Sequence, residues 1–162
     1  MRLSDTICAM AWWRKKRQQN GDMPSDSETV DVMRRLAEEF VMVSGAPDLL
    51  DFTVESIRAL DLLVDSMLEA ASAEALDERF GLGMGAYVGE VIVRQSDKAR
   101  WTYDIDQRTA AVESPQFAAF PHFKVSKRFM IGPEHSLEQF VRVALEDRMP
   151  PEARPMRAKG IR

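Results

Sequence analysis

One stretch decides the fold: residues Gly81–Arg94, GLGMGAYVGEVIVR, which carry four glycines within nine positions. Glycines in a loop can cradle a phosphate, whereas glycines four residues apart on a helix open one face to close packing. A dinucleotide fingerprint needs G-x-G-x-x-G directly after a buried strand, and a Walker loop needs Gly-Lys-Ser/Thr. The glycines here stand at positions 81, 83, 85 and 89, and residues of helical character precede them. The spacing predicts a helix over about residues 82–94 and argues against a nucleotide site.

Gly85 and Gly89 would lie on the same face of that helix, since they are four residues apart. Each glycine costs a helix about 1 kcal/mol relative to alanine. We therefore expect close packing to offset this loss, with a neighbouring helix or the Trp101 ring lying against the glycine face. The two glycines are predicted to form a helix-packing surface.

Glu90 and Arg94 form the candidate polar site on the same helix, with Trp101 and Tyr103 on the strand that follows. Glutamate four residues before arginine is the favourable order for a helical ion pair. A buried pair of charges is costly and is often kept for a function, so this pair could mark a ligand or catalytic centre. A purely structural ion pair is the alternative.

Upstream of the glycine stretch the pattern is helical. Ser25 and Glu28 form a capping box that opens a helix, and Gly45 is its natural stop. Thr53 is expected to cap a second amphipathic helix, which keeps three acidic residues on its outer face: Asp61, Asp65 and Glu69. Ser72 would cap a short helix through Arg79, which Phe80 and Gly81 would end.

Downstream the pattern changes to short strands. Residues 99–104, 109–113 and 116–120 read as three strands, and Ile105–Arg108 can form a turn. Pro121 then starts a helix to about Met130, with three residues inward: Phe123, Val125 and Phe129. Ser136 caps a last helix. Because the strands cluster instead of alternating with helices, the sequence predicts an α+β fold: a helix-rich single domain with a small three-stranded antiparallel sheet.

The chain of 162 residues is long enough for one domain, which we place at residues 25–147, between a basic extension (1–24) and a proline-rich, disordered basic tail (148–162). The single cysteine, Cys8, can form no internal disulfide and offers no zinc-site spacing. No apolar run approaches the roughly 18–20 residues that cross a bilayer, and the N-terminus lacks the order of a secretory signal. The simplest expectation is a cytoplasmic protein.

The net charge of −4 is unevenly distributed along the chain. Residues 1–20 and 148–162 each carry +4, so residues 21–147 carry −12. An acidic body repels the nucleic-acid backbone, which argues against a nucleic-acid partner.

The N-terminal extension offers a candidate membrane contact. Trp12 and Trp13 stand directly before four cations, Arg14, Lys15, Lys16 and Arg17, and follow apolar residues at helical spacing. Indole rings beside cations are typical of interfacial anchors. The alternative is a basic extension whose tryptophans pack on the body.

Few other residues suggest chemistry. The two histidines, His122 and His135, stand at the ends of predicted elements. The position of Ser136 predicts a helix cap rather than a nucleophile. A candidate basic contact on one helix consists of Lys124, Lys127 and Arg128. It could hold an acidic partner or the acidic helix face of Asp61, Asp65 and Glu69 in the same molecule. We expect no metal and no cofactor.

Several motifs together suggest a relationship: Leu50-Asp-Phe-x-x-Glu-Ser56, Leu60-Asp61, Gly85-Ala-Tyr-Val-Gly-Glu-Val-Ile-Val-Arg94, Trp101, Phe120-Pro-x-Phe-Lys-Val-x-Lys127 and Gly132-x-x-x-Ser-Leu137. This combination resembles a family of uncharacterised actinobacterial proteins, a domain of unknown function, over about residues 45–146. The resemblance implies the α+β fold and carries no activity to this chain.

Taken together, these features favour a non-enzymatic interaction or regulatory module whose partner is a protein. One alternative is a small-ligand binder or enzyme with a polar pocket around Glu90 and Arg94. A second is peripheral membrane association through the tryptophans and cations of the N-terminal extension.

Overall fold

The structure is a computed structural model that describes residues 23–70 and 77–146. Within these residues the chain forms five α-helices, two 3₁₀ turns and one sheet. In chain order they are α2 (Asp26–Val43), η1 (Pro47–Leu49), α3 (Val54–Ala70), α4 (Glu78–Gln95), β1 (Arg100–Asp104), β2 (Thr109–Glu113), β3 (Ala118–Ala119), α5 (Pro121–Met130), η3 (Pro133–His135) and α6 (Leu137–Leu145). The predicted α+β class, rich in helix with a small three-stranded antiparallel sheet, is confirmed.

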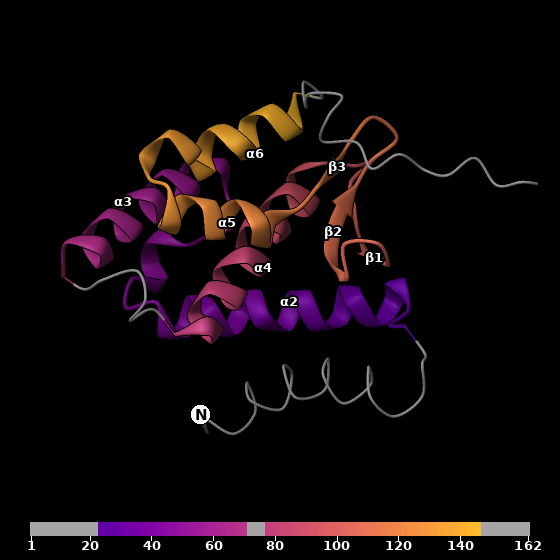
Figure 1. The fold of residues 1–162 in the computed structure, drawn as a ribbon, viewed down its shortest axis with the longest axis horizontal. Coiled ribbons are helices and arrows are strands. Elements are labelled where there is room, and N and C mark those ends of the chain that lie inside the picture. The colour runs from indigo at the N-terminus through magenta and orange to yellow at the C-terminus, as the bar shows by residue number, and fades with distance from the viewer. Residues whose placement is uncertain (1–22, 71–76, 147–162) are drawn as a thin grey trace, which may run out of the picture.

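The glycine-bearing helix α4 lies at the centre of the molecule. In Figure 1 it runs through the middle, with α2 along one side and α5 and α6 on the other. Every residue from Gly83 to Ile92 is buried, so this helix has neighbours all round. A helix that is buried all round must let its neighbours approach closely.

Helix α4 begins earlier than its sequence pattern predicts. The Asp77 side chain accepts a hydrogen bond from the Arg79 N–H (3.1 Å) and caps the helix, which starts at Glu78. The prediction that Phe80 and Gly81 end a preceding helix is therefore wrong, because both lie in the first turns of α4. The predicted Ser72 cap lies outside the described residues.

Three of the four glycines of α4 each face a side chain from another element. Gly83 lies against Phe40 of α2, where an added Cβ would come within 3.0 Å of the Phe40 Cβ. A Cβ at Gly85 would overlap the His122 ring, and one at Gly89 would overlap the Trp101 ring. The missing side chains thus admit α2, α5 and β1 to the helix backbone.

Local signals set the boundaries of α2. Ser25 accepts from the Glu28 N–H while the Glu28 carboxylate accepts from the Ser25 N–H, so the predicted capping box is present. Gly45, just beyond the helix, has a φ of 77°. This left-handed conformation suits glycine and stops the helix where the sequence predicted.

The sheet is a meander in the order β1-β2-β3. Trp101 pairs with Val112, and Val112 pairs with Ala119. The third strand is shorter than predicted, because Ser114 Oγ accepts from the N–H groups of Gln116 and Phe117 at 3.2 Å and folds this segment into a turn. β1 and β2 form a regular hairpin that carries Trp101 toward α4.

Helix α5 has the predicted bounds, but one of its aromatic residues points outward. Val125 is buried as expected, whereas Phe123 is 42% exposed and stacks on Phe120, with ring centroids 5.6 Å apart. The prediction that Phe123 enters the core is therefore wrong. Gly132, with a φ of 132°, ends this segment, and Ser136 caps α6 by accepting from the Gln139 N–H.

The contact of Trp101 with Gly89 makes a direct prediction. Gly89→Ala should lower the free energy of unfolding by about 1–3 kcal/mol, because overpacking against the indole outweighs the gain of about 1 kcal/mol in helix propensity. Gly81→Ala is the matched control in the same helix, since nothing lies within 4 Å of its added Cβ. Urea unfolding measures both variants. An unchanged or raised stability of Gly89→Ala would contradict the packing account.

Candidate functional site

The polar pair predicted on α4 consists of a buried, fully partnered Glu90 and an Arg94 that reaches the surface. Glu90 is 3% exposed. Its Oε1 accepts from the Arg94 Nε at 3.0 Å, and its Oε2 accepts from the Trp101 Nε1 at 3.0 Å. A second cation, the Arg34 Nε, lies 3.8 Å from Oε1. Both oxygens of this carboxylate therefore have donors inside the fold.

Arg94 extends this cluster to the surface. Its guanidinium lies 3.8 Å from the Phe52 ring centroid and 3.4 Å from the Glu38 carboxylate. Tyr103, the fourth residue of the candidate polar site, donates its backbone N–H to Asp26 at the start of α2 (3.3 Å). The structure brings Glu90, Arg94 and Trp101 together in an arrangement that favours the structural ion pair over a catalytic centre.

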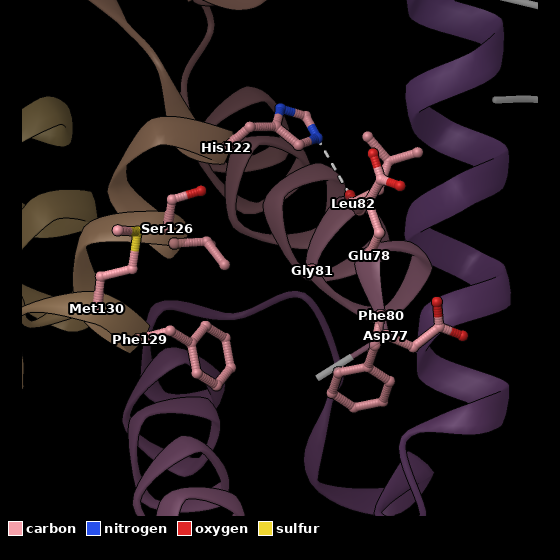
Figure 2. Close-up of a pocket in the computed structure, with 10 residues that line it drawn as sticks. Asp77, Glu78, Phe80, Gly81, Leu82, His122, Ser126, Phe129 and Met130 are labelled. Atoms are coloured by element: carbon pink, nitrogen blue, oxygen red, sulfur yellow. Dashed lines mark hydrogen bonds between the residues drawn. The ribbon is translucent and has the colours of Figure 1, made fainter. Parts of the chain in front are cut away.

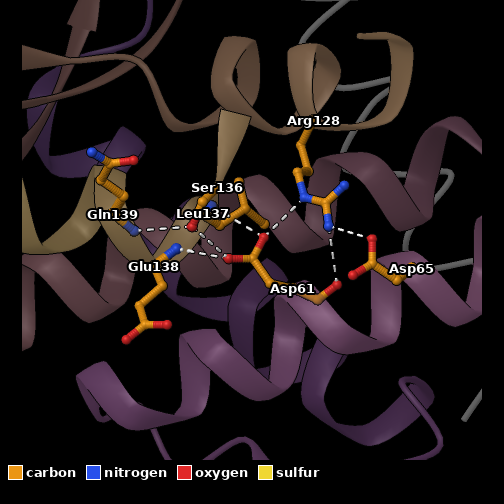
Figure 3. Close-up of polar contacts among 7 residues, drawn as sticks. All are labelled: Asp61, Asp65, Arg128, Ser136, Leu137, Glu138 and Gln139. Carbon is orange, nitrogen blue, oxygen red and sulfur yellow. Dashed lines mark hydrogen bonds and ion pairs between the residues drawn. The ribbon is translucent and has the colours of Figure 1, made fainter. Parts of the chain in front are cut away.

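A second carboxylate, largely buried, joins three helices (Figure 3). Asp61 of α3 accepts from Arg128 Nε at 3.0 Å, from Ser136 Oγ at 2.9 Å, and from the N–H groups of Leu137 and Glu138 at 3.1 and 3.0 Å. The carboxylate thus caps α6 while it binds the guanidinium of α5. The prediction that Asp61 lies on an outer face is wrong, because its side chain is 15% exposed.

The candidate basic contact is divided between the interior and the surface. Arg128 is 2% exposed and binds both Asp61 and Asp65, so it turns to the acidic helix of the same molecule. Burial alone would lower the Arg128 pKa, but its bonds to Asp65 and Asp61 outweigh burial and raise it. Lys124 Nζ lies 5.9 Å from the Phe140 ring centroid, and Lys127 is exposed. Of the three, Lys127 alone is an exposed cation.

A pocket lies elsewhere, between the first turns of α4 and helix α5 (Figure 2). Its volume is about 310 Å³. We call it the α4–α5 pocket and define it by its lining residues: Asp77, Glu78, Phe80, Gly81, Leu82, His122, Val125, Ser126, Phe129 and Met130. In Figure 2, Phe80 and Gly81 face Ser126 and Phe129 across the opening. The walls are mainly apolar, and two carboxylates stand at the α4 end.

His122 forms part of the pocket wall and is held in one orientation. Its Nε2 lies 3.1 Å from the Leu82 carbonyl oxygen, which accepts, so Nε2 carries the proton. Its Nδ1 is buried and has no hydrogen-bond partner in the part of the chain that the structure describes. Burial lowers the pKa of His122 to about 4, against the opposing effect of the Leu82 bond. The ring is therefore neutral near pH 7 and acts as a wall of the pocket.

Sequence reasoning did not find the α4–α5 pocket. Its two walls stand about forty residues apart in the chain, as Leu82 and His122 do. Each apolar lining residue alone reads as part of a core. The available signal was the capping motif at Asp77, which would have placed Phe80 and Leu82 in the first turns of a helix.

Other kinds of site find no support among the described residues. No three His, Cys, Asp or Glu side chains in residues 23–70 and 77–146 are grouped to hold a metal ion. In the same ranges, every helix is too short or too polar to cross a membrane. The candidate membrane contact, Trp12–Arg17, lies outside the described residues.

No protein-family model, curated protein or solved structure matches the chain. The resemblance to the actinobacterial family therefore stays a prediction.

The environment of His122 predicts an unusual titration. The imidazole should stay in its neutral Nε2–H form from pH 7 to pH 5, because its folded pKa is about 4 rather than 6.5. Nitrogen-15 NMR of the side chain measures the tautomer and the midpoint directly. A midpoint near 6.5, or a proton on Nδ1, would contradict the assignment.

The same shift fixes the sign of a pH dependence of stability. Between pH 6.5 and 4 the unfolded chain binds the His122 proton and the folded chain does not. His122 therefore makes stability fall as the pH falls through this window, by at most about 1.4 kcal/mol per pH unit. His122→Gln should lose less stability than the wild type between pH 7 and pH 5 in urea unfolding.

Proposed function

We propose that this protein is a non-enzymatic interaction module that holds apolar side chains of a protein partner in the α4–α5 pocket. The observation that carries the proposal is an apolar hollow that continues onto an exposed apolar surface of α5. Met130 lines the hollow and is 81% exposed, and Phe123 and Ile131 on either side of it along the chain are 42% and 57% exposed.

Large exposed apolar side chains beside a pocket are a feature of interaction surfaces. Covering a methionine or phenylalanine side chain stabilises a complex by about 1.5–3 kcal/mol before the costs of association. A volume of about 310 Å³ is at the small end for ligand pockets, and it is sufficient for one or two side chains. The wider apolar surface around Met130 favours a protein partner over a small molecule, because a small molecule would contact the hollow alone.

The state of the buried carboxylates supports a binding role over an enzymatic one. Glu90 and Asp61 are each satisfied by donors from neighbouring elements, so neither presents a free oxygen to a substrate. His122, the one titratable ring at the pocket, has its Nε2 bonded to Leu82 and its Nδ1 buried. These contacts orient helices and strands.

Site-specific photo-crosslinking tests the proposal in the native host. A benzophenone amino acid in place of Met130 should give a discrete adduct of higher mass with another protein. The matched control carries it in place of Leu62, an equally large apolar residue that is 61% exposed on α3.

A charge in the pocket tests whether the adduct depends on it. Ser126 is exposed in the free protein, so a glutamate there would be covered only by a bound partner. Ser126→Glu should reduce the adduct about tenfold or more, because covering an unpaired carboxylate costs roughly several kcal/mol. Ser66→Glu, at an exposed serine of α3, should leave it unchanged. An equal yield of adduct from position 62, or an adduct yield that Ser126→Glu does not change, would reject the α4–α5 pocket as the interaction site.

A further inference from the structure

We propose that the α4–α5 pocket is occupied by the apolar part of the protein's own N-terminal segment, residues Leu3–Trp13, which a partner must displace. The inference rests on the proposed function, since it assigns the regulation of the same site. Its grounds are the chemistry of the pocket walls, the distribution of charge, and the length of chain between the segment and α2.

The side chains of the N-terminal segment match the walls of the pocket. Leu3, Ile7 and Met10 recur at helical spacing, and Trp12 and Trp13 follow them. The facing walls consist of aliphatic and aromatic side chains together with one thioether: Phe80, Leu82, Val125, Phe129 and Met130. Apolar helices bind such hollows with anchors three and four residues apart, and sulfur–aromatic contacts add to the fit.

The charges are complementary as well. Residues 1–20 carry five basic side chains against one acidic, a net charge of +4. The described residues carry 21 acidic side chains against 12 basic, a net charge of −9. Two carboxylates, those of Asp77 and Glu78, line the α4 end of the pocket, whereas the exposed Lys127 is not a lining residue. Arg14–Arg17, directly after the tryptophans, would meet this acidic end.

The chain is long enough for the contact. Phe80 at the pocket lies beside Phe40, with ring centroids 5.0 Å apart, and Phe40 stands about 21 Å along α2 from Asp26. Trp13 is thirteen residues before Asp26, a reach of up to about 45 Å when extended. Tethering also raises the effective concentration of the segment to the order of millimolar, so a contact too weak between separate molecules is populated within one chain.

Cys8 permits a direct test in the full chain. It is the single cysteine, so one nitroxide label attaches there, beside Ile7 in the proposed docking segment. Paramagnetic broadening of the amides of Gly81 and Ser126 reports on the pocket. The amide of Gln107, in the turn after β1, is the reference.

The reference amide separates a docked segment from an undocked one. Tyr103 bonds to Asp26, which places the end of β1 at the start of α2, where the segment is attached. An undocked segment should therefore broaden Gln107 more than the pocket amides, whereas a docked segment should broaden Gly81 and Ser126 at least about threefold more than Gln107. The pattern should persist on tenfold dilution. Stronger broadening at Gln107, or loss of the pocket signal on dilution, would overturn the inference.

Matched variants place the contact at the pocket. Ser126→Glu should reverse the pattern, so that Gln107 is broadened more than the pocket amides, and Ser66→Glu should preserve it. Retention of the pattern in Ser126→Glu would overturn the inference.

An uncharged fluorescent probe, N-phenyl-1-naphthylamine, separates failure of this inference from failure of the proposed function. The full chain with Trp12→Ala and Trp13→Ala should bind the probe at least about fivefold more tightly than the wild type, because its pocket is vacated. If both chains bind the probe equally and Ser126→Glu abolishes this binding, the segment does not dock, and the pocket is still an apolar binding site. Absence of binding by both chains would reject the pocket and both proposals.

Discussion

The close approach of the Trp101 ring to the backbone of α4 at Gly89 is the contact on which the rest of the structure depends. A side chain at position 89 would occupy the space of the indole. With that space open, the ring lies flush on the helix and its Nε1 reaches the Glu90 carboxylate at 3.0 Å. One residue thus joins the sheet to the central helix by packing and by a hydrogen bond. Gly85 admits the His122 ring in the same way, which sets α5 beside α4.

Buried charge in this protein serves orientation. The Glu90 carboxylate is shared between a strand and two arginines, and the Asp61 carboxylate is shared between Arg128 and the first turn of α6. Removal of either carboxylate would leave unpaired donors in the interior, which is costly. The same packing covers α4 from Gly83 to Ile92 and leaves its first turns facing an apolar hollow. We place the function at this N-terminal end of the central helix.

Sequence patterns predicted the structural features that depend on residues close together in the chain. They did not predict the features that depend on contacts between residues far apart in the chain. The capping box at Ser25 and the stops at Gly45 and Gly132 are local, so the bounds of α2 and α5 follow from sequence. The start of α4 was misplaced because Gly81 resembles a helix stop, whereas the cap at Asp77 overrides it. The sequence around Asp61 predicts a surface residue, because its partner Arg128 stands 67 residues later in the chain. The α4–α5 pocket needs two such distant segments, so the capping motif at Asp77 alone could not predict it.

The central claim is that α4 is the buried helix around which the other elements assemble. Native-state hydrogen exchange measures this claim directly, because it gives each amide its own free energy of opening. The account predicts that amides from Met84 to Ile92 exchange only through global unfolding and are the slowest among residues 23–70 and 77–146, while those of Glu78–Leu82 at the pocket open at lower free energy. Exchange of the Met84–Ile92 amides through local opening, at a lower free energy than the middle of α2, would contradict it.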